Sequence, residues 1–262
     1  MKPHRYEEFR DLHRAGAPLL LPNAWDHASA AALATAGFRA VGTTSLGVAA
    51  AAGLPDGTGA TRAETVRLAR GLSRLDALVS VDIEGGFSEC PEEVAALAAE
   101  LADAGIVGVN IEDGRPDGTL RDLSHQCEIL RAVRESVAGG LFVNARTDTY
   151  WLPGAGQAPE TGERLDAYRR AGADGVFVPG LRDLRIISEL TSGLTDTPLN
   201  TLHAPEGPSV PELAEAGVRR VSCGSLLFRA ALGAAVAAAR SLSVSADIPS
   251  YAETQALAGA FA

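Results

Sequence analysis

Lysine is almost missing from this chain of 262 residues. Of the 23 basic residues, 22 are arginine, and the only lysine is Lys2. Schiff-base aldolases and pyridoxal phosphate enzymes need an amine nucleophile in a desolvated pocket, so the composition argues against both mechanisms. Cysteine is also scarce, since Cys90, Cys127 and Cys223 lie far apart without a Cys-x-x-Cys pair. This spacing argues against a zinc site and predicts reduced, buried thiols.

Long apolar runs and an excess of positive charge are absent too. No run of 18 apolar residues occurs, and residues 1–14 are polar, so we expect neither a membrane span nor a signal peptide. The formal net charge of -10 argues against nucleic acid or an anionic membrane as a partner, because both are bound by basic surfaces. With 46% hydrophobic and 21% charged residues, we expect a globular, cytoplasmic protein with a sizeable core.

A short phrase recurs along the chain: an Ala-rich stretch, then Ala-Gly, then a brief β-rich run. It occurs at residues 36–42, 104–110, 171–178 and 216–222. Glycine accepts the left-handed conformation just after a helix, so each copy predicts a helix, a turn and a buried strand. Four more apolar runs, which no Ala-Gly pair precedes in this way, lie at 19–21, 78–81, 141–143 and 198–202.

Eight short strands alternating with helices predict an α/β fold, a single-domain (β/α)8 barrel of the TIM type. The alternative is an open, doubly wound sheet. The sequence favours it less, because Pro22-Asn23-Ala24-Trp25 follows the first strand where a Gly-x-Gly-x-x-Gly turn would stand. We assign residues 1–240 to the barrel and residues 241–262 to a C-terminal extension with a last helix.

Polar residues directly follow the predicted strands, and barrels of this type carry their catalytic groups at the C-terminal ends of strands. Asp82 and Glu84 are two positions apart on an extended segment, so we expect them on one side, and Glu112 ends the neighbouring strand. Three converging carboxylates repel one another unless a cation compensates, and hard oxygen ligands suit Mg²⁺ or Mn²⁺. The alternative is that these carboxylates cap helices or pair with arginine.

Two further strand ends predict an anion site. Arg146 follows the next strand, where its forked guanidinium suits a substrate carboxylate or phosphonate. A salt bridge from Arg146 to Glu112 or Asp148 is the alternative, and it does not exclude the first role. The segment Thr44-Ser45-Leu46 follows the second strand and could offer backbone N–H groups to an anion.

Taken together, the strand-end phrases resemble the isocitrate lyase/phosphoenolpyruvate mutase superfamily from about residue 19 to residue 229. The likeness rests on the order and spacing of six phrases: Leu21-Pro22-Asn23-Ala24-Trp25-Asp26, Gly42-Thr43-Thr44-Ser45-Leu46-Gly47 followed by Gly53-Leu54-Pro55-Asp56, Val81-Asp82-Ile83-Glu84-Gly85-Gly86, Gly108-Val109-Asn110-Ile111-Glu112-Asp113, Asn144-Ala145-Arg146-Thr147-Asp148, and Ala171-Gly172-Ala173-Asp174-Gly175. The resemblance implies an Mg²⁺-dependent enzyme acting on small 2-oxo or 2-hydroxy acids, or on phosphonate relatives, through an enolate-like intermediate.

The resemblance also implies roles for single residues in metal binding and catalysis. By matching position, Asp82 is the direct metal ligand, and Glu84 and Glu112 hold metal-bound waters. Glu84 stands where an aspartate is more usual, so it needs a longer reach. Asp56 matches a carboxylate on a mobile segment after the second strand, and Arg146 matches the arginine that clamps the substrate anion.

Substrate contacts follow from the same matches. Thr44, Ser45 and Leu46 correspond to the segment whose backbone binds the substrate carboxylate and keto oxygen. Asn200 and Arg229 resemble substrate contacts of the lyase branch.

One departure separates the chain from true isocitrate and methylisocitrate lyases. Those enzymes carry a Lys-Lys-Cys-Gly-His loop after the fourth-strand Glu-Asp, and its cysteine is the proton donor. Here the stretch is Gly114-Arg115-Pro116-Asp117-Gly118, so we expect the donor to be water, Asp56 or a hydroxyl such as that of Tyr150. We also expect Gly-rich segments 52–59 and 114–119 to cover the barrel mouth.

From these observations we expect a lyase that cleaves a C–C bond of a small 2-oxo or 2-hydroxy dicarboxylate. One alternative is P–C bond chemistry, as a mutase or hydrolase of phosphoenolpyruvate- or phosphonopyruvate-like substrates. Another is a noncatalytic binder of oxo acids. The resemblance further suggests a homo-oligomer, a dimer or tetramer, that exchanges a C-terminal helix, because residues 230–242 and 251–261 are apolar enough to need a partner.

Overall fold

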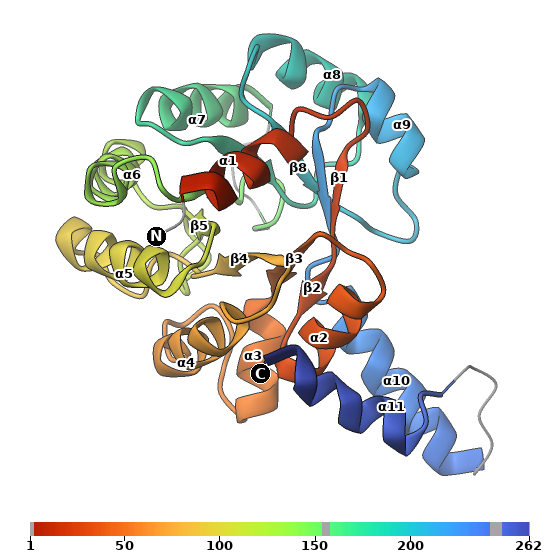
Figure 1. Ribbon diagram of the computed structural model, residues 1–262. Coiled ribbons are helices and arrows are strands. Elements are labelled where there is room, and N and C mark those ends of the chain that lie inside the picture. Colours follow the sequence, from red (N-terminus) through yellow and green to blue (C-terminus); the bar gives the residue numbers. More distant parts are fainter. Residues whose placement is uncertain (1–2, 154–157, 242–247, 262) are drawn as a thin grey trace.

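The computed structural model describes residues 3–153, 158–241 and 248–261, and Lys2 lies outside this range. Its strands form one parallel sheet that curls into a nearly closed barrel with helices around the outside (Figure 1). The strands are β1 (Leu19–Leu21), β2 (Asn23–Ala24), β3 (Ala40–Thr43), β4 (Leu78–Asp82), β5 (Gly108–Glu112), β6 (Phe142–Arg146), β7 (Gly175–Val178), β8 (Leu199–Leu202) and β9 (Arg220–Ser222). The predicted TIM-type barrel is confirmed, and the alternative prediction of an open, doubly wound sheet is wrong.

The described chain has nine strand segments where eight were predicted, because the first strand is split at Pro22. Leu20 in β1 pairs with Val221 in β9, whereas Asn23 in β2 pairs with Gly42 in β3. Proline has no N–H to donate to a sheet ladder and fixes its own φ angle. The two halves of the first strand therefore bond to opposite neighbours, and this closes the barrel.

The described helices alternate with the strands and cover the barrel. They are α1 (Pro3–Leu12), α2 (His27–Thr35), α3 (Ser45–Ala52), α4 (Arg62–Leu72), α5 (Pro91–Ala104), α6 (Leu123–Val137), α7 (Ala158–Arg170), α8 (Leu184–Gly193), α9 (Val210–Glu215), α10 (Leu226–Ser241) and α11 (Tyr251–Ala256), followed by a 3-10 helix, η1 (Leu257–Phe261). The four Ala-Gly phrases do end helices. Their glycines have φ values of 95°, 101°, 102° and 91° at Gly37, Gly105, Gly172 and Gly217, where a side chain would be strained.

The interior of the barrel contains a layer of polar side chains directly below the C-terminal ends of the strands. Asn144 donates through Nδ2 to Asn110 Oδ1 at 2.8 Å and to Asn200 Oδ1 at 3.2 Å. Arg220 Nη2 donates to Asn110 Oδ1 at 3.1 Å. All four side chains are buried. Burying a polar group raises the free energy of the folded state unless the group is hydrogen-bonded. These hydrogen bonds therefore hold the side chains directly below the strand ends in defined positions.

Helix α1, which the sequence did not predict, packs against the N-terminal ends of the strands. Phe9 is fully buried and meets Phe142 edge-on, with ring centroids 5.4 Å apart. His13 follows α1 and stacks on Phe142 at 4.3 Å, and its Nδ1 lies 2.8 Å from Phe9 O. The N-terminal helix thus seals the end of the barrel opposite the strand-end residues.

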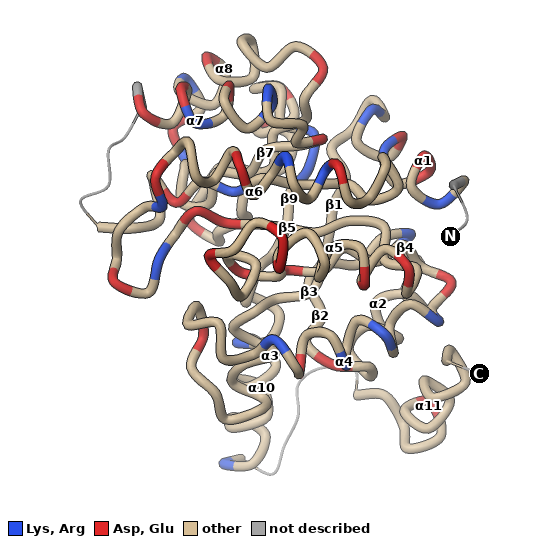
Figure 2. Tube along the Cα trace, turned by 90° about the vertical axis from the view of Figure 1, so that its left-hand side faces the viewer, with Lys and Arg blue, Asp and Glu red and all other residues tan. Residues whose placement is uncertain are grey.

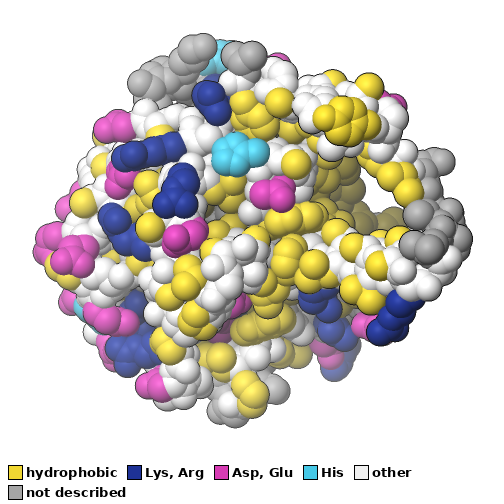
Figure 3. Space-filling model, turned by 90° about the horizontal axis from the view of Figure 1, so that it is seen from below, with side chains coloured by type: hydrophobic (Ala, Val, Ile, Leu, Met, Phe, Trp, Pro, Cys, Tyr) yellow, Lys and Arg dark blue, Asp and Glu magenta, His cyan; other side chains and the backbone are white. Residues whose placement is uncertain are grey.

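Helices α10 and α11 project from the barrel (Figure 1). Phe228 is the buried residue of α10, whereas Leu232 and Val236 are 53% and 52% exposed. Arg229 and Arg240 are its only charged residues, so the helix is almost uniformly tan in Figure 2. Hydrophobic side chains gather on the face of the molecule on which α10 and α11 lie (Figure 3).

Two smaller predictions concern cysteine and the membrane. Cys127 is buried as expected, but Cys90 is exposed and Cys223 is half-buried, and none of the three forms a disulfide. No helix in the described part of the chain is long and apolar enough to cross a membrane.

The burial of His13 predicts a pH dependence of stability. Burial, with Arg220 nearby, lowers the pKa of His13 from 6.5 to about 3. The unfolded chain therefore takes up a proton below pH 6.5 that the folded protein does not, and stability falls as the pH drops from 6.5 towards 3, by up to about 1.4 kcal/mol per pH unit. We expect His13→Phe, which keeps an aromatic ring on Phe142, to flatten the free energy of unfolding between pH 6.5 and 4.

Urea unfolding at half-unit pH steps measures this effect. At pH 5 the wild type should have lost about 2 kcal/mol more than the variant, relative to pH 7. His125→Gln on α6 controls for removing an imidazole at the surface. Parallel pH profiles for wild type and His13→Phe would contradict the prediction.

Candidate active site

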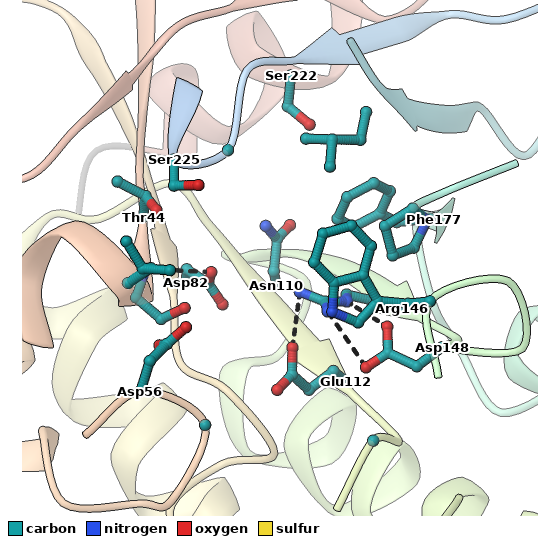
Figure 4. A pocket seen from close by; sticks show the side chains of 18 of the residues that line it. Thr44, Asp56, Asp82, Asn110, Glu112, Arg146, Asp148, Phe177, Ser222 and Ser225 are labelled. Carbon is teal, nitrogen blue, oxygen red and sulfur yellow. Dashed lines mark hydrogen bonds and ion pairs between the residues drawn. The ribbon is translucent and has the colours of Figure 1, made fainter. Parts of the chain in front are cut away.

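A cavity of about 320 Å³ opens at the C-terminal ends of the strands. This volume is at the lower end of the range for small-molecule sites, roughly 300 to 1,000 Å³. Seven of the residues predicted for the site line it: Thr44, Ser45, Leu46, Asp56, Asp82, Glu112 and Arg146. Figure 4 shows that Thr44, Asp56 and Asp82 lie on one side of the cavity and Arg146 on the other.

Arg146 is held between two carboxylates. Its Nη1 lies 2.8 Å from Glu112 Oε2, and its Nε and Nη2 donate to the two oxygens of Asp148 at 2.6 and 3.2 Å (Figure 4). Burial acts to lower the pKa of Arg146, but Glu112 and Asp148 outweigh it and raise the pKa. The predicted salt bridges are therefore present, and they fix a permanently charged guanidinium at the wall of the cavity.

A second buried set of residues holds Asp148 in place. The backbone N–H of Asp148 donates to Asp113 Oδ1 at 2.9 Å. The other oxygen of Asp113 accepts from Tyr168 Oη at 2.5 Å and from Arg164 Nη1 at 3.3 Å. Asp113 is fully buried, and its bonds are satisfied within the protein. It therefore positions Asp148, and through Asp148 the guanidinium of Arg146.

Asp82 ends β4 and carries a half-buried carboxylate that receives only long hydrogen bonds within the described part of the chain. Ser45 N and Glu84 N donate to its two oxygens at long distances of 3.4 and 3.3 Å. Burial raises the pKa of Asp82, and although Arg146 counteracts this, the charge of Asp56 raises it further. Such a carboxylate is stabilised as an anion when a cation binds beside it.

The donor set fits a hard divalent cation that keeps most of its waters. Asp82 and Glu112 end neighbouring strands and line the same cavity, and burial raises the pKa of both side chains. No group of three or more His, Cys, Asp or Glu residues is arranged for a metal ion in the described part of the chain. Mg²⁺ binds through one or two carboxylates, with water and substrate oxygens completing its shell, so two carboxylates suffice.

The structure does not place Glu84 beside Asp82 in the cavity, which corrects the expectation from the two-residue spacing. The extended segment ends at Asp82, and Glu84 has a left-handed backbone with φ 49°. Its Oε2 accepts from Gly59 N at 2.9 Å and its Oε1 from Thr61 Oγ1 at 2.6 Å. Glu84 therefore anchors the segment that carries Asp56, and its predicted contact with metal-bound water stays a prediction.

The N-terminus of α3 supplies an anion-binding edge to the cavity. The helix begins at Ser45, and its N-cap residue, Thr44, makes no side-chain capping hydrogen bond. The first N–H groups of a helix have no partners within the helix, and the helix dipole favours an anion there. The N–H groups of the first turn of α3 are therefore suited to a carboxylate, and the predicted binding of the substrate there stays a prediction.

Three other predicted residues lie elsewhere. Asn200 is buried in the polar layer under the cavity, where its Nδ2 donates to Ser222 Oγ at 3.1 Å. Arg229 is exposed on α10 and donates to Ser225 Oγ at 3.2 Å. Neither residue lines the cavity, and neither does Tyr150. Their predicted roles towards the substrate stay predictions.

The sequence missed an apolar side of the cavity. It is lined by Trp151, Leu152, Phe177, Pro179 and Leu202. The guanidinium of Arg146 lies 5.7 Å from the ring centre of Trp151 and 5.6 Å from that of Phe177. Phe177 and Leu202 lie in strands that read as core, and Trp151 lies in a turn, so nothing in the pattern marked them as site residues.

Comparisons with known proteins show which family the chain resembles. Residues 9–243 match the family model described as phosphoenolpyruvate phosphomutase. An uncharacterised protein of Mycobacterium tuberculosis is 44% identical over 95% of both chains. A 2-methylisocitrate lyase of Halalkalibacterium halodurans is 32% identical over 71% of this chain and 64% of its own length.

A solved structure extends the likeness to the whole barrel. A candidate phosphonomutase from Burkholderia cenocepacia J2315 superposes with a TM-score of 0.85 and 38% identity, covering 92% of this chain and 99% of that one. The superfamily that these proteins represent contains both lyases and mutases. The chain belongs to the phosphoenolpyruvate mutase/isocitrate lyase superfamily.

Proposed function

We propose that the protein is an Mg²⁺-dependent lyase that cleaves a C–C bond of a small 2-oxo or 2-hydroxy dicarboxylic acid through an enolate-like intermediate. Mn²⁺ is the other cation that the donor set suits. One observation carries the proposal: the half-buried carboxylate of Asp82, the α3 N-terminus and the guanidinium of Arg146 line one small cavity. The 2-methylisocitrate lyase relative supports a lyase.

Different residues bind the two ends of a dianionic acid. The first-turn N–H groups of α3 receive the carboxylate and oxo oxygen at one end, and Arg146 receives the negative group at the other end. A Mg²⁺ ion held by Asp82, with Glu112 on its bound water, would supply positive charge where the enolate charge develops. Arg146 stays charged because Glu112 and Asp148 hold it, so anion binding costs no reorganisation of the site.

The cleavage itself needs a group that gives and takes a proton. For a 2-hydroxy acid, a base removes the hydroxyl proton, and the C–C bond breaks to give an oxo acid and an enolate. The enolate then takes up one proton. Asp56 lines the cavity on an exposed segment that Glu84 anchors at Gly59 and Thr61. We assign the proton transfers to Asp56, because the stretch Gly114–Gly118 contains no cysteine and Tyr150 lies outside the cavity lining.

A substrate panel tests the proposal. The purified protein is incubated with 2-oxo, 2-hydroxy and phosphono acids, with and without Mg²⁺, and pyruvate and glyoxylate are measured. Release of either product from a dicarboxylate supports the lyase, whereas turnover of phosphono acids alone replaces it with P–C bond chemistry. Deuterium uptake from solvent into the methyl group of pyruvate separates weak catalysis from binding alone.

Assembly into a homo-oligomer is part of the proposal. Leu232 and Val236 lie four residues apart on α10, so they share one face of a helix that projects from the barrel, and both are about half exposed. Tyr251 on α11 is 82% exposed. A second copy of the chain would cover this apolar face, and exchange of the C-terminal helices would bury it.

The first prediction from this proposal concerns the metal. Exhaustive chelation should abolish activity, and Asp82→Asn should lower the affinity for Mn²⁺, measured by electron paramagnetic resonance, because the amide lacks the charge that binds the cation. The same titration of Glu84→Gln decides the predicted role of Glu84. Loss of affinity assigns Glu84 to the metal, and unchanged affinity assigns it to the Asp56 segment. Full activity after chelation contradicts the proposed metal dependence.

The second prediction concerns Asp56. Asp56→Asn should lower kcat at least about 100-fold, the usual size of a lost acid–base contribution, while the Mn²⁺ affinity changes little. Asp117→Asn provides the matched control, since Asp117 lies on an exposed turn and bonds to Thr119. An unchanged kcat, or a loss of metal binding in Asp56→Asn, would remove Asp56 from its catalytic role.

The third prediction concerns assembly. Light scattering at micromolar concentration should give a mass that is a multiple of 27.0 kDa. The double variant Leu232→Glu, Val236→Glu should shift this mass towards the monomer, because two charges cannot be buried in an apolar interface. Ser192→Glu on α8 controls for added surface charge. A monomeric wild type is the result that would refute the assembly.

A further inference from the structure

The side-chain amide of Asn110 has a fixed orientation in the polar layer below the cavity. Its Oδ1 accepts two hydrogen bonds, from Asn144 Nδ2 at 2.8 Å and from Arg220 Nη2 at 3.1 Å. An arginine side chain has donors and no acceptor, so the amide atom that faces Arg220 must be the oxygen. The amide nitrogen, Nδ2, is therefore turned away from both donors.

This nitrogen carries two N–H groups that find no acceptor within the described part of the chain. Asn110 is only 7% exposed, and both of its described side-chain hydrogen bonds are accepted by Oδ1. The residue lines the cavity, and in Figure 4 its amide lies between Asp82 on one side and Arg146 on the other. Because a buried N–H group is unfavourable without an acceptor, an oxygen atom of a ligand in the cavity would satisfy this donor.

Arg220 makes the amide of Asn110 a better donor. The guanidinium is fully buried, and its Nε and Nη1 have no hydrogen-bond partner among the described residues. Burial lowers the pKa of Arg220 to about 9, so the group is still charged at neutral pH. A hydrogen bond from a cation to Oδ1 polarises the amide and strengthens the N–H groups on its other side. Fixed amide donors of this kind stabilise an oxygen on which negative charge develops.

We propose that Asn110 binds the substrate by donating through Nδ2 to one of its oxygen atoms, and that Arg220 is the positioning residue that holds the amide in this orientation. The inference rests on the proposed function, because it takes from it the binding of an anionic acid between the α3 N-terminus and Arg146. Asn110 adds a neutral donor between these two ends. It gives up no proton, so the proton transfers remain with Asp56.

Oxalate is a suitable probe, because it is a planar dianion that resembles the enolate of pyruvate. Its Kd is measured by calorimetry in the presence of Mn²⁺, and the Kd of Mn²⁺ alone is measured by electron paramagnetic resonance. Two variants remove the donor. Asn110→Leu has a similar volume and adds no charge, whereas Asn110→Asp keeps an oxygen for Arg220 and Asn144 and turns a second oxygen towards the cavity.

In both variants, the Kd for oxalate should rise at least about tenfold, as expected when a hydrogen bond to a charged group is lost. The Kd of Mn²⁺ alone should stay within about threefold in Asn110→Leu, because an N–H group does not bind a cation. Thermal unfolding checks that each variant is folded. If Asn110→Leu does not fold, Asn110→Asp decides the outcome, because it retains the hydrogen bonds to the polar layer.

Asn144→Leu is the matched control. Asn144 belongs to the same layer but does not line the cavity, and Arg220 still orients Asn110 in this variant. The Kd for oxalate should therefore stay within about threefold. A second pair of variants tests the positioning role. Arg220→Met should weaken oxalate binding, because the amide of Asn110 can then turn over, and Arg220→Lys, which keeps a charged donor, should restore it.

Four results overturn the binding role of Asn110: no oxalate binding by the wild type, an unchanged Kd for oxalate in Asn110→Asp or in folded Asn110→Leu, an equal loss in Asn144→Leu, or an equal loss of Mn²⁺ affinity in Asn110→Leu. Unchanged oxalate binding in Arg220→Met removes the positioning role. If oxalate binding changes as expected but no acid is cleaved, the inference holds and the lyase proposal fails. If Asn110→Leu cleaves a dicarboxylate with the kcat/KM of the wild type, the lyase stands and the role of Asn110 is wrong.

Discussion

The arrangement of the cavity depends on one largely buried cation, Arg146, and on the two carboxylates that pair with it. Glu112 holds one end of the guanidinium and Asp148 holds two of its nitrogens. Removing either carboxylate would leave a buried charge with fewer partners, which is costly. Asp113 in turn fixes the backbone of Asp148, and Tyr168 and Arg164 fix Asp113. A chain of hydrogen bonds thus connects α7 on the outside of the barrel to the wall of the cavity.

The same constraint explains why Asp82 is suited to a metal. Arg146 pairs with Glu112 and Asp148, whereas the described contacts of Asp82 are two long hydrogen bonds from backbone N–H groups. The site therefore has more negative than positive charge on its lining before a substrate enters. A divalent cation and an anionic substrate together restore the balance, because the cation offsets the carboxylates and the guanidinium attracts the substrate.

Below the cavity, hydrogen bonding fixes positions that packing alone would leave loose. Asn110, Asn144 and Asn200 come from three strands and bond to one another inside the barrel. Around the mouth, Glu84 ties down the base of the Asp56 segment at Gly59 and Thr61. The residues expected to bind substrate therefore lie above a layer of hydrogen-bonded side chains, and Asp56 lies on a segment that Glu84 holds at one end.

The sequence by itself was enough to predict the barrel. The recurring Ala-Gly pairs mark the ends of helices, because a glycine adopts the left-handed conformation there for local steric reasons alone. It also predicted that Asp82, Glu112 and Arg146 lie together, as they do in the lining of one cavity, because parallel strands bring their C-terminal ends to one edge of the sheet. Only the tertiary structure decided that Pro22 splits the first strand, that Glu84 turns towards Thr61, and that Trp151 reaches Arg146. Those outcomes depend on the partner that each backbone or side chain meets from a distant segment, and residue spacing carries no information about such partners.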